Sequence, residues 1–266
     1  MIPDVLVLQG NPLVEDAGLL FGGMEQSCWK KWVSPDNCVE LVSNVLLIQT
    51  NDLKILFDPG PGPFRLSGKA AWESTGEQNI LKSSLEKQGI HADEITHIFL
   101  SHLHMASASG LLSKKRGPLL FENAVYYTGK DQFDRSKHPH ILDEHLFMPE
   151  LAVLLEESDQ LELISGDSTF CLGNLTLSFL ETQGHTPGML LPFIDTGEQK
   201  ILFAGDIIPG PLWRNLLIHT GFDRYPELLI DEKRKLLETA DRENSLLFYP
   251  FSLTMEYSGP EYQDEI

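Results

Sequence analysis

Short apolar runs recur along the chain, and four of them end at an Asp or a His beside Gly, Pro or Ser. These runs cover residues 54–57, 95–100, 175–181 and 200–204. Aliphatic runs of this length, bounded by turn-forming residues, are typical of buried strands. The polar residues that follow them are Asp58, His102 with His104, His185, and Asp206. The pattern therefore predicts strands that carry candidate functional side chains at their ends.

The remaining pattern predicts further strands and three helices. Strands are expected at residues 5–9, 39–50, 124–128, 161–164, 169–172 and 245–248. Apolar residues at helical spacing predict helices at residues 79–88, 149–157 and 231–240. Strands and helices thus mix along the whole length, which indicates an α/β protein.

Two segments show neither the alternating spacing of apolar residues typical of a strand nor the spacing typical of a helix. Residues 11–35 are rich in Gly and turn-forming residues, and we expect a flap over a pocket or, alternatively, plain packing of the two Trp side chains. Residues 130–149 contain three histidines, His138, His140 and His145. Because no strand or helix signal fixes these histidines, we interpret that segment as a solvated loop rather than a second metal site.

One tetrapeptide occurs twice. Lys-Ile-Leu-Phe stands at residues 54–57, before Asp58, and again at residues 200–203, before Asp206. The repeat is short enough to arise by chance. Otherwise it marks two similar halves of the chain, each with a strand that ends in a carboxylate.

Composition narrows the class of protein. The 266 residues, 42% of them hydrophobic, suffice for one domain with a sizeable core over residues 1–266. The formal net charge of −19 opposes nucleic acid and anionic membrane surfaces, so we expect a small neutral or cationic substrate. Three widely spaced Cys residues without a CxxC pair suggest neither a disulfide framework nor a cysteine zinc site. Without a signal peptide or membrane span, the expected location is cytoplasmic.

The most informative motif is the pair His102 and His104. Two imidazoles one residue apart at a strand end can point the same way and share one metal ion, although such pairs are also common as hydrogen-bonded histidines. With Asp58, His185 in a GHTPG turn, and Asp206, the order of motifs resembles the metallo-β-lactamase-fold superfamily over about residues 40–250.

The resemblance implies a four-layer αββα sandwich, in which the two Lys-Ile-Leu-Phe strands meet at one edge. It implies that His102, His104 and His185 bind the first metal and that Asp206 is the bridging carboxylate. Asp58 is then a residue that orients a ligand through a hydrogen bond, or simply a cap of its turn. Residues 258–266 are expected to form a loose tail.

The sequence departs from the family pattern at the second metal. Where the HxHxDH motif has Asp and His, the chain has Ala106 and Ser107, and no His follows His219. The last family His should fall near Tyr249, Pro250 or Phe251. All three ligands that belong to the second metal alone are therefore missing. We predict one divalent metal, with zinc favoured over iron or manganese, and no second metal site.

Three functions stay open. The first is a single-metal hydrolase of a small ester or lactone, in which Asp206 is the fourth ligand or the catalytic base. Residues 21–23 (FGG), 29–32 (WKKW) and 221–227 (GFDRYPE) loosely resemble the lactonase and organophosphate-hydrolase branch. The second is a binding protein with little or no metal.

The third is a mononuclear iron oxygenase, with a face of two histidines and one carboxylate formed by His102 or His104, His185 and Asp206. The oligomeric state is left open by the sequence. For any of these functions, the segment after Asp206 offers candidate pocket walls, namely Trp213, His219 and Phe222.

Overall fold

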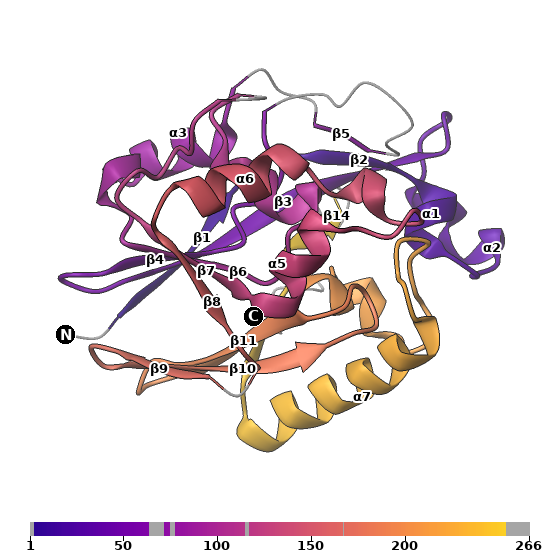
Figure 1. Cartoon of the computed structure of the whole chain (residues 1–266). Coiled ribbons are helices and arrows are strands. Elements are labelled where there is room, and N and C mark those ends of the chain that lie inside the picture. Colours follow the sequence, from indigo (N-terminus) through magenta and orange to yellow (C-terminus); the bar gives the residue numbers. More distant parts are fainter. Residues whose placement is uncertain (1–2, 64–71, 75–77, 115–116, 167, 254–266) are drawn as a thin grey trace.

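Two sheets face each other, with helices on their outer sides, in the computed structural model (Figure 1). The structure describes residues 3–63, 72–74, 78–114, 117–166 and 168–253. The predicted loose tail, residues 258–266, lies outside these ranges. The predicted αββα sandwich is confirmed.

The larger sheet has nine strands. Seven form a continuous path in the order β5 (Trp72–Ser74), β2 (Leu13–Asp16), β3 (Cys38–Gln49), β4 (Lys54–Phe57), β6 (His97–Leu100), β7 (Val125–Gly129) and β8 (Leu161–Ile164). Two more, β1 (Asp4–Gln9) and β14 (Phe251–Leu253), also pair with β3. The strands from β4 to β8 are parallel, and their buried aliphatic residues fit a parallel sheet that is covered on both faces.

The smaller sheet has five strands, in the order β13 (Leu246–Phe248), β12 (Lys200–Phe203), β11 (Met189–Asp195), β10 (Leu175–Thr182) and β9 (Thr169–Leu172). Adjacent strands in this sheet are antiparallel, except that β12 and β13 are parallel.

Helices cover both sheets. In Figure 1, α3 (Ile80–Lys87) and α6 (Pro149–Glu157) lie over the larger sheet, with α5 (Lys130–Lys137) beside them, and α7 (Pro226–Glu243) lies under the smaller one. Three short helices are α1 (Ala17–Phe21), α2 (Gln26–Trp29) and α4 (Met105–Ala108). The 3-10 turns are η1 (Lys30–Trp32), η2 (Ala92–Glu94), η3 (Ser109–Leu111), η4 (Glu144–Leu146), η5 (Gly205–Ile207) and η6 (Pro211–Arg214). None of the helices in the described ranges has the length and apolarity that a bilayer crossing requires.

Local sequence explains where the main helices begin and end. The Asn79 side chain accepts a hydrogen bond from the Lys82 amide and so caps α3, whose Leu81 and Leu85 face the core. Helix α7 begins at Pro226 and ends before Asn244, which adopts a left-handed conformation with φ of 50°. Each helix therefore buries one apolar face against a sheet.

Aromatic side chains fix the two sheets relative to each other. Phe57 at the end of β4 lies 5.5 Å from Phe99 of β6 and 6.4 Å from Phe203 at the end of β12, measured between ring centroids. Phe57 and Phe203 are the last residues of the two Lys-Ile-Leu-Phe runs. The repeated runs therefore meet across the core, and the chain leaves both strands at the same edge of the sandwich.

Two segments differ from the sequence-based expectation. The interpretation of residues 130–149 as a loop is wrong, because it contains α5, which buries Phe133 and Gln132 among otherwise polar residues. The single apolar side chain in that helix hid the helical period. Residues 11–35 contribute β2, α1, α2 and η1 and bury Phe21 and Trp29. That this segment works as a flap stays a prediction.

Candidate functional site

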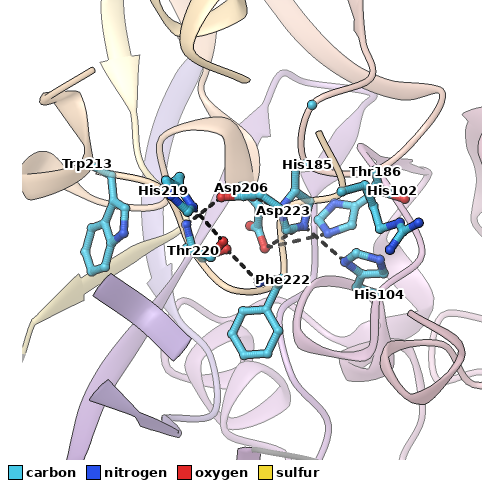
Figure 2. Close-up of polar contacts among 12 residues, drawn as sticks. His102, His104, His185, Thr186, Asp206, Trp213, His219, Thr220, Phe222 and Asp223 are labelled. Atoms are coloured by element: carbon cyan, nitrogen blue, oxygen red, sulfur yellow. Dashed lines mark hydrogen bonds and ion pairs between the residues drawn. The ribbon is translucent and has the colours of Figure 1, made fainter. Parts of the chain in front are cut away.

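The residues that follow three of the predicted strands, His102 with His104, His185, and Asp206, lie close together at one edge of the sandwich (Figure 2). His102 Nε2 lies 3.7 Å from Asp206 Oδ2, and His185 Nε2 lies 3.5 Å from the same oxygen. Asp58 joins the group through Ser101, which precedes His102. Residues from both halves of the chain thus form one site.

Three buried histidines form its centre. His102, His104 and His185 each offer one ring nitrogen, and these nitrogens all lie within 4.8 Å of one another. The His104 Nδ1 and His185 Nε2 atoms are 3.1 Å apart. Over the described ranges no other group of His, Cys, Asp or Glu is close enough to share a metal ion, and His138, His140 and His145 do not form one.

Ser101 and Asp58 hold the ring of His102. The Asp58 carboxylate accepts hydrogen bonds from the Ser101 amide at 2.7 Å and from the Ser101 hydroxyl at 2.5 Å. The hydroxyl oxygen lies 2.9 Å from His102 Nδ1 and can accept a hydrogen bond from the Nδ1–H group. This arrangement keeps Nδ1 protonated and leaves the Nε2 lone pair facing the other histidines. Asp58 adopts a φ of 41°, in the left-handed region that Asp tolerates better than most residues.

Asp223 holds the ring of His185 in the same way. The His185 Nδ1–H donates to Asp223 Oδ1 at 2.7 Å, and Asp223 Oδ2 accepts from the Thr220 amide at 2.5 Å. The turn before His185 is fixed by Glu232 of α7, whose carboxylate accepts from the Gly184 amide at 2.9 Å. The Nε2 lone pair of His185 therefore also points to the centre of the site.

Burial and charge set the protonation of the histidines. Burial lowers the pKa of His102 and His104 well below the usual value, and the neighbouring histidines lower it further. Burial also lowers the pKa of His185, but its hydrogen bond to Asp223 and the charges of Asp206 and Asp223 outweigh this, so its pKa is raised. Two of the three rings are thus neutral near pH 7, the state that binds metals.

The carboxyl groups respond to burial in the opposite direction. Burial raises the pKa of Asp206, against the effect of His185. Burial also raises the pKa of Asp58 to about 8, although its hydrogen bonds with Ser101 act to lower it. A carboxyl whose pKa is raised can hold a proton nearer to neutral pH, which is useful in acid–base chemistry.

The donor set fits one divalent metal. The two facing nitrogens of His104 and His185 sit at a separation close to that between two ligands of a tetrahedral ion with bonds of about 2.0–2.1 Å. The buried Asp206 Oδ1, beside these nitrogens, has no hydrogen-bond partner. Unpaired polar atoms in a buried site are unfavourable unless a ligand or water satisfies them. Three imidazoles and a nearby carboxylate suit zinc and iron alike.

The neighbouring position has different chemistry. Ala106, on α4, and Phe251, at the start of β14, line the pocket beside Asp206. Ser107 is buried and places its hydroxyl 3.5 Å from His102 Nε2. A methyl group, a phenyl ring and a neutral hydroxyl do not compensate a divalent ion for its lost hydration. The residues here do not fit a second metal.

A small pocket of about 50 Å³ opens beside the histidines, which is room for a few water molecules. Its walls are mostly apolar and include Leu13, Leu20, Leu41, Leu146, Pro209 and Phe222. Of the predicted wall residues, Phe222 lines the pocket, whereas Trp213 packs against Phe21 and donates to the Leu20 carbonyl. His219 lies against Gly22 instead. The polar lining residues besides His104 and His185 are Glu15, Asp206 and Thr220.

Sequence reasoning missed three residues of the site, namely Asp223, Glu232 and Glu15. Asp223 lies within the GFDRYPE segment, but the sequence does not indicate that it contacts His185. The inward orientation of Glu15 could have been predicted from the sequence. In the strand Leu13–Asp16, Leu13 and Glu15 alternate with less buried residues, so period-two spacing places both on the inner face.

Facing sheets covered by helices, with buried histidines gathered at the strand ends, define a protein of the αββα class with a metal-type site. The chain belongs to the metallo-β-lactamase superfamily, whose sequence model matches residues 38–250. The family predicted from the motifs is thereby confirmed.

Individual relatives are distant. N-acyl homoserine lactonase AiiA of Bacillus thuringiensis subsp. kurstaki is 22% identical over 254 residues, which cover 90% of this chain and 94% of that protein. A probable metal-dependent hydrolase from Staphylococcus aureus superposes with a TM-score of 0.80 at 22% identity, covering 94% of this chain and 90% of that one. AidC, a dizinc quorum-quenching lactonase with bound product, superposes with a TM-score of 0.75 at 22% identity. The match covers 94% of this chain and 87% of that one. These structural likenesses show the fold.

Proposed function

We propose that this protein is a single-metal hydrolase that opens a lactone or cleaves an ester of a small molecule. The observation that carries the proposal is the convergence of the His102, His104 and His185 nitrogens within 4.8 Å, beside a pocket that contains a carboxylate. The names of the distant relatives, lactonases and a probable metal-dependent hydrolase, support the same class of reaction.

In this proposal the three histidines hold one divalent ion, with zinc favoured. When bound, such an ion supplies Lewis acidity and lowers the pKa of water to about 7. Ser101 with Asp58, and Asp223, orient the rings of His102 and His185 through their Nδ1 atoms. Orienting groups of this kind typically improve metal affinity by about 10- to 100-fold.

Asp206 is the proton carrier. Its Oδ2 lies beside His102 and His185, and its Oδ1 has no hydrogen-bond partner. It accepts a proton from the attacking water and returns it to the alkoxide oxygen that leaves the acyl carbon, so that acid and alcohol are formed from ester and water. The raised pKa of Asp206 suits this transfer. Apolar walls such as Phe222 and Leu41 exclude water and contact the acyl part.

The experiment combines elemental analysis with an assay of an N-acyl homoserine lactone and a p-nitrophenyl ester. About one equivalent of zinc is expected, with hydrolysis that a chelator removes and zinc restores. Asp206→Asn should keep the metal but lower kcat by about 10²- to 10⁴-fold. The exposed Asp134→Asn serves as a control with the same charge change and unchanged activity.

Other results overturn the proposal. One equivalent of iron with substrate-dependent oxygen uptake indicates the oxygenase. A protein that binds little metal and turns over neither substrate, even after loading with zinc, indicates the binding protein.

A further inference from the structure

The pocket contains a buried carboxyl that the proposed mechanism does not use. Glu15 lies on β2 and is only 2% exposed, yet it lines the pocket together with Asp206. Its Oε2 atom has no hydrogen-bond partner, and neither does Asp206 Oδ1. No Lys or Arg is among the lining residues in the described part of the chain. Asp206 has His185 Nε2 at 3.5 Å, whereas Glu15 forms no ion pair within the described residues.

The position of Glu15 is built into the sheet. Strand β2 is paired on both sides, with Glu15 opposite Val39 of β3 and opposite Trp72 of β5. Alternation along the strand turns Leu13 and Glu15 inward. A side chain held by a doubly paired strand has little freedom to move out to solvent, so its inward orientation is a fixed feature of the fold.

Such a carboxyl is unfavourable without a ligand. Burial raises the pKa of Glu15 well above its usual value, the charges of Asp16 and Asp206 raise it further, and only a hydrogen bond from the Asp16 backbone opposes this. A natural protein that keeps an unpaired buried acid in a pocket commonly uses it to bind something there. A positively charged group placed between Glu15 and Asp206 would remove the repulsion and satisfy both free oxygens.

We infer that Glu15, together with Asp206, binds an ammonium group of the substrate in the pocket that Ala106 and Phe251 also line. An ammonium group has three N–H donors and no acceptor, which matches a pair of free carboxyl oxygens. The rings of Phe222 and Phe251 also line this space, and aromatic faces attract cations. The net charge of −19 favours the approach of a cation.

A metal ion fits these residues less well. Hard divalent ions take six or more oxygen ligands, and zinc takes four from His, Cys or carboxylate. The pocket is also lined by His104 and His185, but the proposed zinc already uses these rings, which leaves only Glu15, Asp206 and the Thr220 hydroxyl for a second ion. The inference rests on the proposed hydrolase for its meaning as substrate recognition, and it adds a substrate class, an ester or lactone that carries an amine.

Binding is tested without turnover, so this test is independent of the proposed reaction. Isothermal calorimetry measures the binding of n-butylammonium and of 1-butanol to zinc-loaded protein. The alcohol has nearly the same shape as the amine but carries no charge. We expect n-butylammonium to bind at least about tenfold more tightly than 1-butanol. Glu15→Gln should remove that preference, whereas Glu162→Gln, an exposed strand residue, should keep it. Zinc content should stay the same in all three proteins.

Glu15→Asp, which keeps the charge on a shorter side chain, should retain part of the preference and so separates loss of charge from loss of folding. Equal binding of the amine and the alcohol, or an unchanged preference in a folded Glu15→Gln protein, overturns the inference. So does a second equivalent of zinc that Glu15→Gln loses, because Glu15 is then a metal ligand. Amine binding without any lactone or ester hydrolysis would instead leave the ammonium site standing and refute the hydrolase.

Discussion

The two halves of the pocket share one edge of the sandwich but differ in how their side chains are supported. In one half, His102 is held through Ser101 and His185 through Asp223, and the ring nitrogens of the histidines converge. In the other half, Ala106 and Phe251 offer no lone pair at all. Asp206 lies between them. The comparison shows that two of the three histidine rings have partners that orient them, whereas Ala106 and Phe251 have no side-chain group to orient.

The difference is one of chemistry rather than of backbone. The helix α4, which carries Ala106, follows His104 directly, whereas Phe251 and Glu15 stand on β14 and β2. The first half offers neutral imidazoles, since burial lowers the pKa of His102 and His104. The second half offers apolar surface and one acid, Glu15, whose Oε2 has no hydrogen-bond partner. The same pocket therefore combines a cluster of three histidines with apolar surface and a buried acid.

The largest expected effect comes from removing a ligand in the first half. His185→Ala should empty the metal position, because two remaining histidines are too few for tight zinc binding, and any hydrolysis should be lost with it. Elemental analysis after dialysis and calorimetric zinc titration measure this. The exposed His140→Ala is the matched control and should keep about one equivalent. Full zinc content in His185→Ala would mean that the ligands lie elsewhere.

The next effect comes from rebuilding the second half. Replacing Ala106 by Asp, Ser107 by His and Phe251 by His restores the ligand types of the family pattern around Asp206. Zinc content should rise from about one to about two equivalents, because these groups replace the hydration shell that a methyl and a phenyl cannot. The same triple variant with Asn at 106 should bind the second ion about tenfold more weakly, since a neutral amide attracts zinc less.

If the unmodified protein already holds two zinc ions per chain, the expectation that only one half of the pocket binds a metal is wrong. A triple variant that folds, as judged by circular dichroism, and still holds one ion would show that backbone position matters more than ligand type.

The smallest effect concerns the support of His185. Below its raised pKa this ring is protonated and cannot bind metal, so zinc affinity should fall by about tenfold per pH unit as the pH drops below that pKa. Asp223→Asn removes the charge that raises the pKa. The pH midpoint should therefore move down, while affinity at pH 7.5 falls by about 10- to 100-fold because the ring is less firmly oriented.

Zinc titrations between pH 5.5 and 8, with the exposed Asp241→Asn as control, measure both effects. An unchanged midpoint in Asp223→Asn would mean that Asp223 does not set the protonation of His185.

Much of the fold was predictable because it rests on local patterns. Apolar runs identified β4, β6, β10 and β12, and the polar residues after them identified Asp58, the histidines and Asp206. The strand β11 and the helix α5 were not predicted. Strand β11 contains Pro192, a residue that argues against a central strand, and α5 has a single large apolar residue, Phe133, to mark its period.

The sequence by itself determined which chemical groups are available and on which strands they stand. It contains His102, His104 and His185, and it has Ala106 and Ser107 where the family motif has Asp and His. Only the tertiary structure decided which distant groups meet. Asp223 reaches His185, and Glu15 shares a pocket with Asp206, through the packing of two sheets. Local periodicity fixes the face on which a side chain lies, whereas its partner on another element depends on how whole sheets pack together.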